Sequence, residues 1–184
     1  MSPAPRKRRR CWISVGSNVE RERSIRGAVA DLRETFGRLI LSPVYETPAV
    51  GFDGESFLNL VAGFDSDRPV ADIDTRLHAI EDAHGRVRGP DKFAPRTLDL
   101  DLLTWGDAVG VFDGVELPRD EILKYGFVLG PLAEVAPDER HPATGRRYAD
   151  LWAELSPAME PLRPCALVLD DGGNGPQMNA NRRQ

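Results

Sequence analysis

The spacing of apolar residues predicts two amphipathic helices in the first half of the chain. In each stripe the apolar residues recur every three or four positions, which is the period of one helix face. The first stripe consists of Ile25, Val29, Leu32 and Phe36, and Gly37 ends it. The second begins after Pro69, a residue favoured in the first helical turn, and ends near Gly85; its members are Ile73, Leu77 and Ile80.

Short apolar runs bounded by turn residues predict the strands. The runs cover residues 12–15, 39–46, 57–64, 97–105 and 166–169. Asp113-Gly114 is typical of a tight hairpin turn, which predicts a small hairpin over 109–115. Residues 127–135 and 148–155 are expected to be helical. The order β-α-β-β-α-β predicts an α+β fold with a ferredoxin-like core and a mixed or antiparallel sheet.

Composition indicates a single domain over residues 11–170, preceded by a disordered basic tail (1–10) and followed by a disordered Gly/Asn-rich tail (171–184). Five of the 24 basic residues lie at 6–10, so the remaining chain has 19 basic and 29 acidic residues and a net charge of −10. An acidic body is a poor nucleic-acid binder, and no apolar run is long enough for a membrane helix. Cys11 and Cys165 form no disulfide framework, which favours the cytoplasm. We expect a monomer with no nucleic-acid or membrane partner.

The strand that begins near Leu98 carries the most informative pattern of the chain. Leu98, Leu100 and Leu102 should point into a core, while Asp99 and Asp101 should share the opposite face. Two carboxylates about 6–7 Å apart on a strand repel each other unless a cation lies between them. A solvent-exposed acidic strand face would give the same pattern, so the pair alone leaves both interpretations open.

Basic residues just upstream favour the functional interpretation of this strand. They are Arg86, Arg88, Lys92 and Arg96. Carboxylates can hold Mg²⁺ while arginine and lysine neutralise phosphate charge, and both are needed for phosphoryl transfer. The pattern therefore predicts a site for two Mg²⁺ ions and a polyphosphate.

Two further pairs of residues are weaker candidates. His78 and Glu81 lie one turn apart on the second helix, outside the apolar stripe, where they could contact a nucleotide or simply face solvent. Phe57 and Asn59 alternate on one strand, where an aromatic ring and an amide could bind a flat heterocycle. A core Phe and a turn-facing Asn explain the second pair equally well.

Taken together, these motifs resemble the 6-hydroxymethyl-7,8-dihydropterin pyrophosphokinase family over roughly residues 11–140. The motif most specific to the family is the run from Pro95 to Leu102. The other matching motifs are Ser14-Val15-Gly16-Ser17-Asn18, Tyr45-Glu46-Thr47-Pro48, Phe57-Leu58-Asn59 and Gly85-Arg86-Val87-Arg88. The resemblance implies an ATP-dependent diphosphokinase of folate biosynthesis, which transfers pyrophosphate from ATP to the pterin and leaves AMP.

The resemblance also implies a role for each candidate residue. Asp99 and Asp101 would bind two Mg²⁺ ions, and the catalytic set would be Arg86, Arg96, Asp99 and Asp101. The ATP-binding residues would be His78, Glu81, Arg88, Lys92, Leu102 and Arg119. The pterin-binding residues would be Thr47, Pro48, Val50, Phe57, Asn59 and Phe127.

One segment departs from the family pattern. Arg119 stands where the family commonly has His, and Tyr125 stands near the position of a family Arg. Two alternatives therefore stay open beside the pyrophosphokinase. One is a diverged relative that uses another hydroxymethyl heterocycle or another nucleotide, and the other is a non-catalytic pterin-binding protein.

Overall fold

One antiparallel sheet organises the structure, a computed structural model that describes residues 4–48, 56–85 and 98–169. Among these residues the sheet has six strands, five of them in the order β5-β1-β4-β3-β8, while β2 also pairs with β4. The long strands are β1 (Arg9–Ser17), β4 (Phe57–Ser66) and β5 (Asp99–Trp105), and the short ones are β2 (Ile40–Leu41), β3 (Tyr45–Thr47) and β8 (Arg163–Pro164). The predicted α+β class is confirmed, and the β-α-β-β-α-β order holds except that the strand expected over 39–46 is divided into two.

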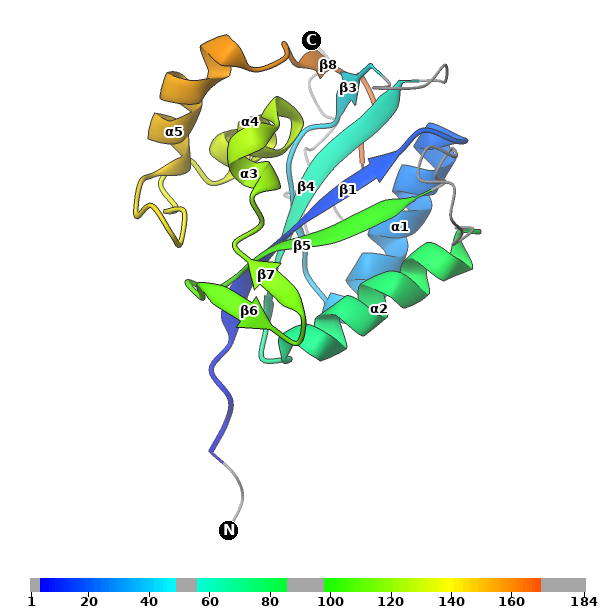
Figure 1. The fold of residues 1–184 in the computed structure, drawn as a ribbon. Helices are drawn as coiled ribbons and strands as arrows, with labels where there is room; N and C mark the ends of the chain where they lie inside the picture. The colour runs from blue at the N-terminus through cyan, green and yellow to red at the C-terminus, as the bar shows by residue number, and fades with distance from the viewer. Residues whose placement is uncertain (1–3, 49–55, 86–97, 170–184) are drawn as a thin grey trace, which may run out of the picture.

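Helices pack on both faces of this sheet (Figure 1). Helices α1 (Arg21–Phe36) and α2 (Val70–Ala83) cover one face, where Leu98, Leu100 and Leu102 lie in the main apolar cluster as predicted. The other face packs against α4 (Gly126–Val135) and α5 (Tyr148–Leu155), through a second cluster that includes Trp12, Val61 and Leu103. The remaining elements are α3 (Glu121–Lys124), the 3-10 helix η1 (Ser156–Ala158) and the hairpin of β6 (Gly110–Phe112) and β7 (Val115–Leu117).

The hairpin turn is the predicted Asp113-Gly114, and both residues have positive φ angles, 50° and 81°. Positive φ at both central positions is the geometry that such two-residue turns require. Glycine adopts it without steric cost, and Asp is among the residues that tolerate it best.

Three predicted boundaries are wrong. The strand expected over 39–46 is split into β2 and β3, because Ser42 bonds Val61 through both its backbone N–H and its hydroxyl, and Pro43 has no N–H to offer. The strand expected over 166–169 is absent, and β8 lies earlier; Leu167 and Leu169 pack on the core without pairing. Strand β1 begins at Arg9, inside the segment expected to be a tail.

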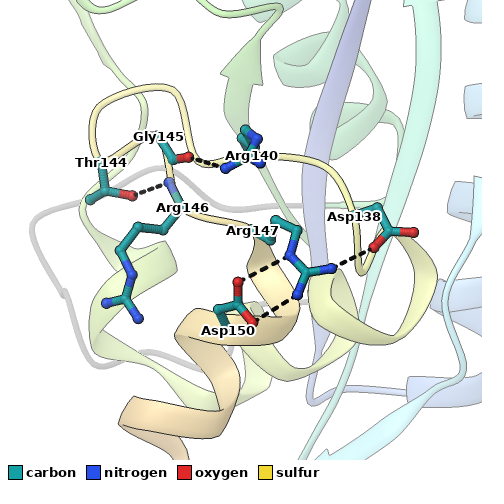
Figure 2. Close-up of polar contacts among 7 residues, drawn as sticks. All are labelled: Asp138, Arg140, Thr144, Gly145, Arg146, Arg147 and Asp150. Atoms are coloured by element: carbon teal, nitrogen blue, oxygen red, sulfur yellow. Dashed lines mark hydrogen bonds and ion pairs between the residues drawn. The ribbon is translucent and has the colours of Figure 1, made fainter.

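Arginine contacts hold the loop between α4 and α5 (Figure 2). The Arg147 guanidinium lies 3.1 Å from a carboxylate oxygen of Asp138 and 3.0 Å from one of Asp150. Arg140 donates a hydrogen bond of 2.8 Å to the carbonyl of Gly145. These contacts fix the entry of the chain into α5.

The imidazole of His141 lies inside the same loop and is 3% exposed. Its Nδ1 accepts hydrogen bonds of 3.2 Å from the backbone N–H groups of Ala143 and Thr144. Burial lowers the pKa of His141, and the two N–H donors require an unprotonated Nδ1. The loop is therefore built around a neutral histidine.

Candidate active site

The pairing register brings polar candidates from four strands onto one face of the sheet. Asp99 of β5 lies opposite Gly16 of β1, Gly16 lies opposite Asn59 of β4, and Asn59 lies opposite Tyr45 of β3. Directly opposed residues share a face and adjacent strands lie about 4.8 Å apart, so these residues form one continuous row. The predicted carboxylates and the predicted heterocycle-binding amide thus lie on the same surface.

Thr47 and Asn59 form the amide end of this row. The Asn59 Nδ2 donates a hydrogen bond of 2.6 Å to Thr47 Oγ1, and both residues are buried. Thr47 lies opposite Phe57, so these three predicted pterin-binding residues lie together on β3 and β4. Pro48 follows at the exposed end of β3.

Gly16 lies in the same row, although the sequence suggested only a turn before the first helix, or an anion contact at its N-terminus, for the segment Gly16–Asn18. A Cβ atom at this position would lie 2.8 Å from Asn59 Oδ1, which is closer than such atoms approach. The absence of a side chain at Gly16 therefore leaves room for the Asn59 carboxamide beside β1. Its place inside the Ser14–Asn18 motif was the available signal.

Glu81 of α2 binds the backbone of β5 between the two aspartates. Glu81 is 1% exposed and its Oε2 accepts a hydrogen bond of 3.1 Å from the backbone N–H of Leu100, which lies between Asp99 and Asp101. Its expected place outside the apolar stripe is wrong. His78 does face solvent, with its side chain 47% exposed and its Nδ1 3.7 Å from Asp74, so the two residues share no environment.

Arg119 lies beside Asp101, one of the two candidate metal ligands. Its guanidinium Nη2 is 3.1 Å from Asp101 Oδ1, and its backbone N–H donates a 2.9 Å hydrogen bond to the carbonyl of Leu103. Leu102, for which we predicted nucleotide contact, points with Leu98 into the core on the opposite face. Any contact of Leu102 with a nucleotide would therefore come from its main chain.

Aromatic side chains lie at the start of α4. The rings of Tyr125 and Phe127 stack with centroids 5.1 Å apart and an interplanar angle of 18°. Tyr45, in the row described above, donates a hydrogen bond to Glu134 of α4. Burial and this hydrogen bond raise the pKa of Tyr45 to about 12. Helix α4 is thus tied to the same sheet face.

Five predicted site residues lie outside the described residues: Val50, Arg86, Arg88, Lys92 and Arg96. The segment 86–97 connects the end of α2 with Leu98, directly before β5. Its basic residues therefore stay predictions, carried by their position in the sequence.

The donor set of the site fits Mg²⁺. Within 4–48, 56–85 and 98–169 no group of three or more His, Cys, Asp or Glu side chains could hold a metal ion. Mg²⁺ is typically bound by one or two carboxylates with the remaining ligands from substrate phosphates and water. Asp99 and Asp101 supply such a pair, and the Asp101 side chain is 45% exposed.

A cavity of about 340 Å³ lies at the other end of β1 and β4. Its lining residues are Arg8, Arg10, Phe36, Arg38, Ile40, Phe64 and Asp65, none of which belongs to the predicted site. Arg10 already pairs with Asp65 at 2.8 Å, and Phe36 stacks on Phe64.

In the described part of the chain, no helix is both long and apolar enough to cross a membrane.

Comparisons with known proteins show the family of the chain. A sequence model of the 7,8-dihydro-6-hydroxymethylpterin-pyrophosphokinase family matches residues 12–137. The chain is 36% identical over 148 residues to the 2-amino-4-hydroxy-6-hydroxymethyldihydropteridine pyrophosphokinase of Pseudomonas aeruginosa, covering 78% of this chain and 90% of that protein. It is 34% identical to the enzyme of the same name from Methylorubrum extorquens, with 70% and 84% covered.

Solved structures show the same fold. Wild-type HPPK-DHPS of Plasmodium falciparum superposes with a TM-score of 0.61 at 12% identity, covering 83% of this chain. The superposed region is 45% of that protein, so the chain spans less than half of its length.

Proposed function

The chain belongs to the 7,8-dihydro-6-hydroxymethylpterin pyrophosphokinase family, and on that premise we propose that it transfers pyrophosphate from ATP to 6-hydroxymethyl-7,8-dihydropterin. The products are the pterin diphosphate and AMP, in folate biosynthesis. The observation that carries the proposal is the row in which Asp99, Gly16 and Asn59 share one sheet face with Arg119 beside Asp101. In this proposal the protein acts as a monomer. It works in the cytoplasm, where cysteines such as its two free ones stay reduced.

The acidic end of the row serves the nucleotide. Asp99 and Asp101 would hold two Mg²⁺ ions, which when bound neutralise phosphate charge. Arg119 takes phosphate charge from the α3 side. On the α2 side, Glu81 holds Leu100 and therefore the spacing of the two carboxylates. The other nucleotide contacts come from His78, Arg86, Arg88, Lys92, Arg96 and the main chain of Leu102.

The amide end of the row serves the heterocycle. Asn59 Nδ2 donates to Thr47, and this bond fixes the carboxamide. Its Oδ1 is then in place to accept an N–H of the ring. Phe57 and Phe127 offer aromatic surface, and Pro48 and Val50 complete the edge. The reacting groups would then meet near Gly16, between the amide and the carboxylates.

The reaction needs little covalent help from the protein. The hydroxymethyl oxygen attacks the β-phosphorus of ATP in line, the bond from that phosphorus to the oxygen bridging to the α-phosphate breaks, and AMP leaves. The hydroxyl proton is released during the transfer. The protein aligns the two substrates and stabilises charge, and no side-chain nucleophile takes part.

Product analysis tests the proposal. Purified protein with ATP, Mg²⁺ and the hydroxymethyl-dihydropterin should form AMP and the pterin diphosphate in equal amounts. Reactions without the pterin control for simple ATP hydrolysis. Formation of ADP instead of AMP, or no turnover, would overturn the proposed activity.

A diverged specificity is the second candidate, and Arg119 with Tyr125 favours it. Both residues depart from the family pattern, and both lie at the site: Arg119 on Asp101 and Tyr125 against Phe127. A panel of hydroxymethyl heterocycles and nucleoside triphosphates measures it. A different acceptor with a higher kcat/KM than the pterin would support this candidate, and binding of the pterin without any turnover would support a non-catalytic binding protein.

A further inference from the structure

Arg119 is attached to β5 at two points. Its backbone N–H bonds the carbonyl of Leu103, and its guanidinium reaches back along the strand to Asp101. Its own carbonyl accepts the N–H of Ile122, which starts α3. The backbone of this residue is therefore fixed, while the end of its side chain rests on a candidate metal ligand.

The guanidinium lies between two carboxylates. Besides Asp101 at 3.1 Å, Arg119 has its Nε 3.7 Å from Glu121 Oε2. The side chains of Arg119 and Asp101 are 31% and 45% exposed, and ion pairs this exposed are weak and open easily. Arg119 could thus release Asp101 and keep an anionic neighbour in Glu121.

The electrostatic consequence follows from the pair of aspartates. Two carboxylates on one strand face favour a nearby cation, and Arg119 supplies one from within the chain. A metal ion at Asp101 competes with Arg119 for the same carboxylate. A nucleotide triphosphate would offer the released guanidinium a new anionic partner.

We propose that Arg119 is an exchangeable counter-ion, which occupies Asp101 in the absence of metal and moves to the phosphates when metal and nucleotide bind. The inference rests on the proposed function, because it takes Asp101 as a metal ligand. Metal alone binds weakly because it must displace Arg119. Metal and nucleotide then strengthen each other's binding by the same factor, as linkage requires.

Calorimetric titration with Mn²⁺, in the presence and absence of a non-hydrolysable ATP analogue, tests the exchange. In Arg119→Gln, Mn²⁺ alone should bind about fivefold more tightly, the ratio expected from losing one exposed ion pair. Binding of the metal–nucleotide complex should weaken, so the coupling between the two ligands falls. A merely structural role would weaken both or leave both unchanged.

Two variants control for charge and folding. Lys124→Ala removes one positive charge from the same segment but from a pair with Asp120, and it should change neither affinity. Arg119→Lys keeps the charge and the backbone contact, and it should keep Mn²⁺ affinity near the wild-type value. Even where Arg119→Gln fails to fold, this variant tests the proposal, because a gain or loss of Mn²⁺ affinity with the charge retained would contradict a counter-ion role.

The outcomes separate the two proposals. If Asp101→Asn abolishes Mn²⁺ binding while Arg119→Gln binds Mn²⁺ as the wild type does, the counter-ion proposal is overturned and the metal site stands. If neither the wild type nor any variant binds Mn²⁺ with or without the nucleotide, the metal site of the proposed function fails.

Discussion

The two faces of the sheet differ in how far helices cover them. On the face toward α1 and α2 the strand residues are sealed, and Leu98, Leu100 and Leu102 are at most 3% exposed. On the face toward α4 and α5, the apolar cluster covers Trp12, Val61 and Leu103, while Asp101 on the same face keeps a side chain 45% exposed. One strand therefore supplies core and candidate site at alternate residues.

We call the face covered by α1 and α2 the sealed face and the face that carries Asp99 and Asp101 the open face. The sealed face also determines the geometry of the open face. Glu81 contacts β5 from the sealed side and fixes Leu100, the residue between the two aspartates. Rigid packing beneath a site keeps its polar groups at a constant spacing. Stability and activity should therefore separate by face: substitutions on the sealed face should lower the free energy of unfolding, and substitutions on the open face should lower activity.

The largest expected effect is a loss of activity caused by a substitution on the open face. Asp101→Asn should lower kcat/KM about 10³-fold, because the amide cannot hold Mg²⁺ against the phosphates. The melting temperature should barely change, since the side chain is half exposed. The rate of AMP formation measures the effect, and Asp107→Asn, in the exposed turn after β5, is the matched control. Activity within tenfold of the wild type in Asp101→Asn would remove this residue from the metal site.

The sealed face should show the opposite behaviour. Leu77 of α2 is fully buried, so Leu77→Ala should lower the free energy of unfolding by about 2–5 kcal/mol through the cavity it leaves. Urea unfolding measures the loss, and kcat at low temperature should stay near the wild-type value. Val111→Ala, at a side chain 69% exposed, should leave stability unchanged. A kcat loss in folded Leu77→Ala as large as that of Asp101→Asn would contradict the separation.

The local sequence predicted the alternation of apolar and acidic side chains along β5. It did not predict every side chain that lies on each side of the sheet. The period of two over Leu98–Leu102 gave both the core leucines and the aspartates, because a strand side chain has only two directions. Glu81 lies four residues after Leu77, so the helical period places it on the buried face, yet its charge suggested solvent. Its partner, the N–H of Leu100, exists only in the folded sheet.

Other features depend on contacts distant in sequence. β8 is a two-residue strand created by pairing with Tyr45 and Glu46, and no local pattern marks it. The apolar alternation at 166–169 reflects packing on the core instead of pairing. The resemblance gave Arg119 only as an ATP-binding residue, and its contact with Asp101, 18 residues away in the sequence, exists only in the folded structure.

Gly16→Ala should affect substrate affinity on the open face with little effect on stability. The added methyl group would displace the Asn59 carboxamide, from which a Cβ would be 2.8 Å, and KM for the pterin should rise about tenfold through the lost hydrogen bond. KM for ATP should not change. Steady-state kinetics measure both constants.

A double-mutant cycle isolates the cause of this effect. If Gly16 acts only by leaving room for Asn59, then Gly16→Ala should have no further effect in an Asn59→Ala background. Additive losses from the two substitutions would show that Gly16 has another role in the site.

The smallest expected effect concerns the α4–α5 loop and its response to pH. Burial lowers the pKa of His141 in the folded state, so below the unfolded value of about 6.5 the unfolded chain binds more protons and the free energy of unfolding falls as pH decreases. His141→Asn keeps a side-chain acceptor for the N–H groups of Ala143 and Thr144 but cannot titrate.

Melting temperatures between pH 7.5 and pH 5 test this linkage. The wild type should lose stability over this interval and His141→Asn should lose less. Equal slopes for wild type and His141→Asn would show that His141 does not set the acid sensitivity. Because α5 follows this loop and packs with α4 in the second apolar cluster, the same acid range should loosen this cluster before it affects the face covered by α1 and α2.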